Sequence, residues 1–218
     1  MRLIFATNNF HKLSEIKDIL GNKYSPYIFT MSDLKISVDP EETGNTFSEN
    51  ALIKSKALYE EMKKNNLLMK GDYLISDDTG LCIDYLDGAP GIKSARFMGN
   101  VSQDEKNNKI LELLKDVEDE KRTAHFITIL SVIEIGDDIS NPKILSFEGK
   151  IKGYIPKNIE KKGGFGYDPI FAVGDVNDMK LGNVKTYSNL GSEKKNKISH
   201  RAIALSKFVE YLEKNHNI

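Results

Sequence analysis

Apolar residues in the first third of the chain alternate between extended runs and helical spacing. Residues 2–6 form an apolar run that predicts a strand and ends at a polar Thr-Asn-Asn segment. The next apolar residues recur at helical spacing: Leu13, Ile16, Ile19 and Leu20. Residues 26–30 indicate a second strand. Residues 46–49 (TFSE) fit a capping box, which predicts a helix from there to about residue 64.

The rest of the chain contains apolar runs separated by Gly- and Asp-rich segments. Residues 123–135 are apolar or β-branched on both faces, which predicts a long central strand. Residues 103–115 have the spacing of an amphipathic helix, and Ser199 can cap a final helix. The other expected elements are strands at 73–77, 81–86, 144–152 and 169–173, a turn at 78–80, and polar loops at 163–168 and 174–198.

The order of these elements defines the fold class. Helices and strands alternate irregularly, which indicates an α/β or α+β fold with a mixed sheet. The length of 218 residues fits one large domain or two small lobes. We therefore expect a single domain spanning residues 1–218, with the edges of a second lobe near 86–100 and 136–142.

Composition then narrows the classes of function. The 31 Lys and Arg residues nearly balance the 32 Asp and Glu residues, so no excess of positive charge favours nucleic-acid binding. The single cysteine, Cys82, lies in an apolar segment and is expected to be a buried hydrophobe. No apolar run approaches the roughly 20 residues of a transmembrane helix, and the first one is too short for a signal peptide. The sequence predicts a soluble, cytoplasmic protein that binds neither nucleic acid nor membranes.

Four polar residues join the first strand to the first helix: Thr7, Asn8, Asn9 and Lys12. Backbone N–H groups at a helix N-terminus attract anions, and a lysine adds positive charge. The segment therefore predicts a phosphate cradle, although a capped helix with a solvated lysine explains the same pattern. It is not a Walker A loop, because the required glycines are absent.

Acidic residues gather in two segments, Glu41-Glu42 and Asp77-Asp78. Paired carboxylates can hold Mg²⁺ between a protein and substrate phosphates. Successive strand residues point to opposite faces, so Asp77 and Asp78 are expected to act differently. Ordinary turn chemistry explains either segment alone. Glu49 fits the capping box better than a metal site.

A glycine-rich segment at 163–169 (GGFGYDP) is a candidate for recognising a flat ring. Its glycines allow the backbone to approach a ligand closely. Phe165 and Tyr167 offer ring faces for stacking, and Asp168 offers acceptors to ring N–H groups. A tight turn with two core aromatic residues is an equally good interpretation.

The last candidate segment is Lys195-x-x-x-Ser199-His200-Arg201. His200 and Arg201 fall in the first turn of the final helix, where a cation is unfavourable. A residue that breaks a local rule is a functional candidate, and Arg201 is one of only four arginines. A solvated polar turn is the alternative. Together the four segments form the inventory of a site for a magnesium-bound nucleotide.

At these same residues the chain resembles the inosine triphosphate pyrophosphatase (HAM1-like) family. The matching segments occur in the family's order and span nearly the whole chain: FATNNFHK at 5–12, EETGNTFSENALIKSKAL at 41–58, SDDTGLCIDYLDGAPGIKSARF at 76–97, GGFGYDPIF at 163–171 and EKKNKISHRAIAL at 193–205. The joint pattern is highly specific, although no single segment is.

The resemblance implies a fold and a reaction. The fold is α/β and two-lobed, with a long central mixed β-sheet flanked by helices and the active-site cleft between the lobes, usually in a homodimer. The reaction is hydrolysis of purine nucleoside triphosphates such as ITP, dITP and XTP to the monophosphate and pyrophosphate. It uses Mg²⁺, for which Mn²⁺ can substitute.

The resemblance also implies roles for individual residues. The segment from Thr7 to Lys12 would hold the triphosphate. Glu41 and Asp78 would ligate the metal, and Asp78 would also accept the proton of the attacking water. The other residues implied to contact substrate are Thr79, Phe165, Gly166, Tyr167, Asp168, Lys195, His200 and Arg201.

Two departures and two rival functions accompany this reading. Asn8 stands where the family often has Gly, and the loop at 174–192 is less typical of the family. One rival is a Maf-like nucleotide pyrophosphatase with another base preference, which product analysis across ITP, dTTP and UTP distinguishes. The other is a non-catalytic nucleotide-binding protein, against which the acid pair of Glu41 and Asp78 argues.

The sequence predicts a base-selective effect of Arg201. Arginine only donates hydrogen bonds, so it suits the 6-oxo group of ITP and opposes the 6-amino group of ATP. Arg201→Ala should lower the ratio of kcat/KM for ITP over ATP by roughly ten- to a hundred-fold. Arg201→Lys should restore only part of it, because lysine lacks the planar fork. Equal losses on both substrates would assign Arg201 to the phosphates or to the fold.

Overall fold

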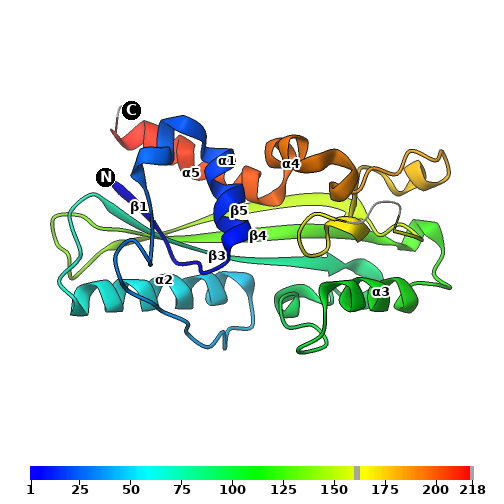
Figure 1. Ribbon diagram of the computed structural model, residues 1–218, viewed down its shortest axis with the longest axis horizontal. Coiled ribbons are helices and arrows are strands. Elements are labelled where there is room, and N and C mark those ends of the chain that lie inside the picture. The colour runs from blue at the N-terminus through cyan, green and yellow to red at the C-terminus, as the bar shows by residue number, and fades with distance from the viewer. Residues whose placement is uncertain (160–162, 217–218) are drawn as a thin grey trace. The chain divides into compact units, whose positions relative to one another are not determined.

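Six strands form one mixed sheet in this computed structural model, which describes residues 1–159 and 163–216 (Figure 1). The strand order is β2-β1-β3-β4-β5-β6, with β1 parallel to β2 and β3, and β5 antiparallel to β6. The strands are β1 (Arg2–Phe5), β2 (Ile28–Thr30), β3 (Asp72–Ile83), β4 (Thr123–Glu134), β5 (Lys143–Tyr154) and β6 (Ala172–Val173). This mixed sheet, flanked by helices, confirms the expected α/β class.

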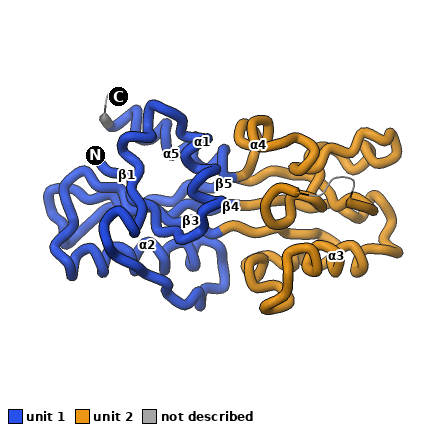
Figure 2. The backbone as a smooth tube through the Cα atoms, viewed as in Figure 1, with its two compact units in different colours: residues 1–78, 128–149, 201–218 blue, residues 79–127, 150–200 orange. Residues whose placement is uncertain are grey.

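The chain divides into two compact units, which Figure 2 colours separately. Unit 1 contains residues 1–78, 128–149 and 201 onward, and unit 2 contains 79–127 and 150–200. The divisions fall within β3, β4, β5 and the last helix, so each of these elements contributes residues to both units.

Unit 1 buries both faces of its part of the sheet (Figure 1). Helices α1 (Phe10–Tyr24) and α5 (His200–His216) cover one face, and α2 (Phe47–Lys64) covers the other. The alternation of side chains along β1 connects it to both layers. Leu3 and Phe5 pack into the core that contains α1 and α5 residues, whereas Ile4 packs with Leu58 of α2.

Unit 2 has a single core, formed between its strands and two helices. Helix α3 (Gln103–Leu113) contributes Ile110, and helix α4 (Tyr187–Ile198) contributes Tyr187. Leu81 and Ile83 of β3 point into this core. The intervening Cys82 is also buried, which confirms its expected role as a small hydrophobe.

The predicted capping box starts α2. The Thr46 side chain accepts a hydrogen bond from the backbone of Glu49, and Glu49 accepts from the backbone of Thr46 at 3.0 Å. Glu49 is therefore a capping residue, as the sequence predicts. Short 3-10 helices occupy Ser25–Tyr27, Asp84–Leu86, Gly91–Lys93, Asp119–Lys121, Asp168–Ile170 and Val176–Met179. No helix among the described residues is long and apolar enough to cross a membrane.

The predicted turn at 78–80 is wrong, because β3 runs unbroken from Asp72 to Ile83. The segment Asp-Asp-Thr-Gly has the composition of a turn, but tertiary contacts override that local preference. Asp77 and Asp78 are both buried inside the strand, where oppositely charged side chains pair with them. The two strands expected around the turn are therefore one strand.

Two further expectations in the C-terminal part are wrong. Residues 187–198 form α4 rather than a polar loop, and its Thr186 side chain accepts from the backbone of Asn189 in a capping box. That signal was missed because the helix carries few apolar residues and bends at Gly191, whose φ is 73°. Residues 169–173 do not form one strand, because a 3-10 helix occupies Asp168–Ile170 and the strand β6 contains only Ala172–Val173.

Arg122 forms hydrogen bonds to the backbone just after α3 and just after β5. It is buried, and its guanidinium donates to the backbone oxygens of Ile155 at 2.8 Å, Pro156 at 2.8 Å and Leu114. A lysine cannot reach three carbonyl groups with one ammonium. We predict that Arg122→Lys lowers the free energy of unfolding by about 2 kcal/mol, because buried acceptors lose their donors.

Chemical denaturation of Arg122→Lys and wild type measures this difference. Lys121→Ala is the matched control, because Lys121 is the neighbouring exposed cation and pairs only with Glu118 in the part of the chain described. The control should unfold as wild type does. Equal midpoints for Arg122→Lys and wild type would contradict the assigned role.

Candidate active site

Two adjacent carboxylates on β3, those of Asp77 and Asp78, have different charged partners. Asp77 and Asp78 are each only 6% exposed, and both belong to unit 1. Neighbouring strand residues project to opposite faces of a sheet. Asp77 pairs with Lys12, whereas Asp78 pairs with Lys54. The expectation that the two acids act differently agrees with this arrangement.

Asp77 is at the centre of a buried chain of alternating charges. Its Oδ2 atom lies 2.9 Å from Lys12 Nζ and 3.3 Å from Arg201 Nη2. The other terminal nitrogen of Arg201 binds Glu15, and the Arg201 side chain is 2% exposed. Burial alone would raise the pKa of Asp77, but the charges of Lys12, Arg201 and Lys54 hold that pKa far below its ordinary value.

Asp78 shares one ammonium with a second carboxylate. Lys54 Nζ, on α2, lies 3.4 Å from Asp78 Oδ1 and 2.9 Å from Glu42 Oε1. Burial raises the pKa of Asp78, and the charge of Glu42 raises it further against the opposing effect of Lys54. A carboxylate with a raised pKa is better suited to accept a proton than an ordinary one.

The acidic residues fit a magnesium ion whose remaining coordination positions would be filled by substrate oxygens. Asp78 Oδ2 is buried and accepts no hydrogen bond from the residues that the structure describes, which leaves an oxygen available as a ligand. No three His, Cys, Asp or Glu side chains converge within 1–159 and 163–216. Mg²⁺ is commonly held by one or two carboxylates together with phosphates, so two protein ligands suffice.

The second carboxylate beside Asp78 belongs to Glu42 rather than to the expected Glu41. Glu41 is exposed, whereas Glu42 is partly buried against Lys54. Both acids are adjacent in the sequence, and the pattern alone gives no means of choosing between them. Glu41 as a metal ligand stays a prediction, and the contacts favour Glu42.

The proposed phosphate cradle is built around the start of α1. Asn9 is the N-cap, and its Oδ1 accepts from the backbone of Lys12 at 3.2 Å. Thr7 Oγ1 accepts from the backbone of Asn9 at 3.2 Å, and Asn8 is exposed. The capped-helix interpretation is thus correct for Asn9. Lys12 is not simply solvated, because Asp77 holds its ammonium.

Unit 2 contains a second buried ion pair, between Asp168 and Lys195. Asp168 Oδ2 accepts from Lys195 Nζ at 2.8 Å and from the backbone of Phe165 at 2.8 Å. Gly164 makes this fold of the loop possible: its φ is +86°, and an added Cβ would lie 2.8 Å from Asp168 Cβ. The glycine-rich segment therefore wraps closely around the Asp168 carboxylate.

The aromatic residues of this loop differ in exposure. Phe165 is 36% exposed and offers a ring face, whereas Tyr167 is buried in the core and its hydroxyl donates to Ser94 O at 2.8 Å. Stacking by Tyr167 on a ligand is thus excluded by its position, and any other contact from Tyr167 stays a prediction. His200 is also buried and stacks on Phe126 with ring centroids 4.6 Å apart.

The structure separates the predicted site residues by unit. Unit 1 brings Lys12, Asp77, Asp78 and Arg201 into one charge network. Unit 2 brings together Phe165, Asp168 and Lys195. Two unit divisions fall within motifs, between Asp78 and Thr79 and between His200 and Arg201. The predicted contact of Arg201 with a purine base stays a prediction, since two carboxylates engage its guanidinium.

Two residues of the charge network were missed from the sequence, Glu15 and Lys54, whereas Glu42 was noted there as one of two adjacent acids. A signal existed for Lys54, which lies three residues after Ala51 and four before Leu58 on the buried stripe of α2. A charged residue on such a stripe needs a partner of opposite charge. Glu15 precedes the buried Ile16 on α1, and periodicity alone did not distinguish it from a solvated position.

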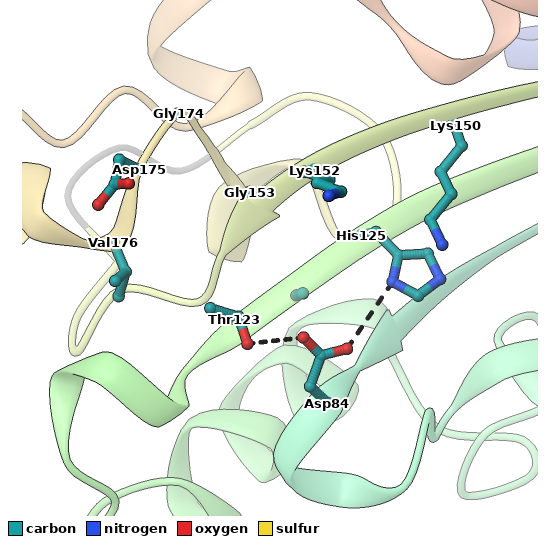
Figure 3. Close-up of a pocket in the computed structure, with 10 residues that line it drawn as sticks. Asp84, Thr123, His125, Lys150, Lys152, Gly153, Gly174, Asp175 and Val176 are labelled. Carbon is teal, nitrogen blue, oxygen red and sulfur yellow. Dashed lines mark hydrogen bonds and ion pairs between the residues drawn. The ribbon is translucent and has the colours of Figure 1, made fainter.

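A separate cavity opens in unit 2 (Figure 3). It has a volume of about 410 Å³, and its lining includes Asp84, His125, Lys150 and Lys152. Asp84 accepts from Thr123 at 2.6 Å and lies 3.8 Å from His125 Nδ1. None of its lining residues is a predicted site residue, and its mixture of acidic and basic groups selects no single class of ligand.

Comparison with known proteins places the chain in a family. The model of the Ham1 family matches residues 3–211, so the chain belongs to the Ham1 family. It is 44% identical to the dITP/XTP pyrophosphatase of Caldanaerobacter subterraneus, covering 98% of this chain and 97% of that protein. It is 39% identical to the dITP/XTP pyrophosphatase of Bacillus subtilis, covering 96% of each.

Solved structures agree with this assignment. The Ham1 protein of Staphylococcus aureus superposes with a TM-score of 0.76 at 35% identity, covering 99% of this chain and 100% of that one. A nucleoside-triphosphatase, or dITP/XTP pyrophosphatase, of Mycobacterium abscessus has a TM-score of 0.69 at 29% identity, covering 96% and 99%. The resemblance inferred from the motifs is confirmed.

The environment of Asp78 predicts that its charge is essential. Asp78→Asn keeps the shape of the side chain and removes its charge and basicity. The kcat for hydrolysis of ITP should fall by at least about a hundred-fold, which is the usual effect of losing a general base. The thermal unfolding midpoint should stay within a few degrees of wild type. Steady-state kinetics and a melting curve measure both quantities.

Asp84→Asn is the matched control for Asp78→Asn. Asp84 follows the same strand but lines the separate cavity of unit 2. Its substitution should leave turnover unchanged. If Asp78→Asn retains turnover within a few-fold of wild type, Asp78 does not accept the proton.

Proposed function

We propose that this chain hydrolyses purine nucleoside triphosphates such as ITP, dITP and XTP to the monophosphate and pyrophosphate. One observation carries the proposal: a buried carboxylate, Asp78, has an available oxygen and lies in a network of lysines. The relatives named dITP/XTP pyrophosphatase support the choice of substrates.

The start of α1 supplies the groups that would hold the phosphates. Backbone N–H groups at a helix N-terminus bind anions, and Lys12 adds a positive charge in the first turn. Asp77 fixes the ammonium of Lys12 at 2.9 Å before substrate arrives. A cation that is already oriented stabilises charge on a leaving pyrophosphate without reorganisation.

Asp78 would accept the proton of the attacking water. Its Oδ1 contacts Lys54, whereas its Oδ2 is available to a proton or to a metal ion. Asp78 and Glu42 are the residues whose carboxylates would hold Mg²⁺, and Mn²⁺ has the same preference for oxygen ligands. When bound, the ion would neutralise part of the phosphate charge.

The base-recognition residues proposed from the motif lie mainly in unit 2. Phe165 has the exposed ring needed for stacking, and the Lys195–Asp168 pair offers both a donor and acceptors. Thr79, Gly166 and His200 are proposed as substrate contacts on the motif alone. A donor placed at the 6-oxo position would favour ITP and XTP over ATP, because a buried donor left unpaired is costly.

The cellular setting and assembly are part of the proposal. We propose a cytoplasmic enzyme that acts as a homodimer, as the family resemblance implies. Its role would be to remove deaminated purine triphosphates from the nucleotide pool. The rival of a Maf-like enzyme predicts faster hydrolysis of dTTP and UTP than of ITP, and the rival of a non-catalytic binder predicts no hydrolysis.

Product analysis tests the proposal. With Mg²⁺ present, ITP should yield IMP and pyrophosphate in equal amounts, as resolved by anion-exchange chromatography. Chelation of the metal with EDTA should abolish turnover, and added Mg²⁺ or Mn²⁺ should restore it. Inosine diphosphate as the first product would contradict cleavage at the α-phosphorus. Equal rates with dTTP and ITP would contradict purine selection.

A further inference from the structure

Glu15 belongs to the charge network of unit 1, but it lies outside every motif that predicted the site. It is 9% exposed, and it binds Arg201, which is itself buried. Both residues come from the starts of different helices, α1 and α5. A buried carboxylate that pairs with a buried arginine of the charge network needs an explanation.

The geometry of the charge network explains the presence of Glu15. Arg201 offers two terminal nitrogens, and each engages a different carboxylate: Glu15 with one and Asp77 with the other. Arginine and a single carboxylate otherwise prefer a two-pronged pairing, which would use both oxygens of Asp77. Glu15 engages one of these nitrogens, and the other lies 3.3 Å from Asp77 Oδ2. Lys12 contacts that same oxygen more closely, at 2.9 Å.

We propose that Glu15 is a positioning residue: by engaging Arg201, it keeps Asp77 available to orient the ammonium of Lys12 toward the leaving phosphates. The inference rests on the proposed function for the role of Lys12. Loss of the Glu15 charge leaves Arg201 with Asp77 as its remaining carboxylate in the network. Asp77 then shifts toward the stronger two-pronged pairing, and Lys12 loses its anchor.

A double-mutant cycle tests the coupling, because residues that act through one another are not additive. Glu15→Gln should lower kcat for ITP about ten- to a hundred-fold and leave KM within about threefold, since Lys12 acts on charge that develops in the transition state. In a Lys12→Ala background, the same substitution should change kcat less than about threefold. Equal losses in both backgrounds would overturn the proposal.

Pyrophosphate binding gives a readout that does not need turnover. Titration calorimetry in EDTA should show that Glu15→Gln weakens binding of inorganic pyrophosphate about tenfold in the wild-type background and not in Lys12→Ala. If wild type hydrolyses no purine triphosphate, the proposed function fails, and this titration still decides the coupling. Unchanged pyrophosphate binding in Glu15→Gln would overturn the role of Glu15.

Two further variants separate positioning from stability. Glu15→Asp keeps the charge with a shorter reach, so it should recover part of the lost kcat. If Glu15→Gln does not fold, the cycle is run with Glu15→Asp, where the same non-additivity is expected at smaller amplitude. Asp18→Asn removes an exposed charge one turn along α1 and should change neither kcat nor pyrophosphate binding.

Discussion

The buried negative charge of Asp77 has to be compensated by cations inside the protein. This requirement constrains where the first turns of α1 and α5 lie. Lys12 in α1 and Arg201 in α5 both put a cation where the helix dipole opposes it, at a cost of about 0.3–1 kcal/mol each. An uncompensated buried charge costs about 3–5 kcal/mol. The ion pairs therefore outweigh the unfavourable helix dipoles. Both cations lie where the first turn of a helix comes close to β3.

Unit 2 also compensates a buried carboxylate, but there the partners come from a loop and one helix instead of from two helices. Asp168 is 4% exposed, and Lys195 of α4 and the backbone of Phe165 satisfy it. The loop closes on this carboxylate because Gly164 tolerates both the left-handed backbone and the close approach. In each unit, a buried carboxylate thus holds the ammonium group of a lysine in a defined position.

Local pattern predicted most of the fold, and long-range charge pairing decided what it missed. The capping box at Thr46, the central strand from residue 123 and the final helix after Ser199 were all readable, because caps and periodicity are local. The turn expected at Asp78 was wrong, since its ion-pair partner comes from α2. The segment motifs include Lys12 and Asp78 but not Glu15, whose partner Arg201 is 186 residues away in sequence.

Arginine usage illustrates what composition can contribute. The chain has four arginines among its 31 Lys and Arg residues, and this low number helped to single out Arg201 from the sequence. Arg2 binds Asp72 through two nitrogens, at 2.8 and 2.6 Å, and Arg122 reaches three carbonyl groups. Arg201 bridges two carboxylates. In each of these three cases the guanidinium donates through more than one nitrogen.

Two adjacent carboxylates of β3 lie in opposite electrostatic environments. Asp77 meets two cations directly, so its pKa is held far below its ordinary value and it stays ionised as an anchor. Asp78, one residue later, meets one shared ammonium and a second acid, and burial raises its pKa. Protonation of Asp77 would weaken its ion pairs with both Lys12 and Arg201. Because the two acids lie on opposite faces of β3, each has its own set of charged partners, and the pKa of Asp77 is lowered while that of Asp78 is raised.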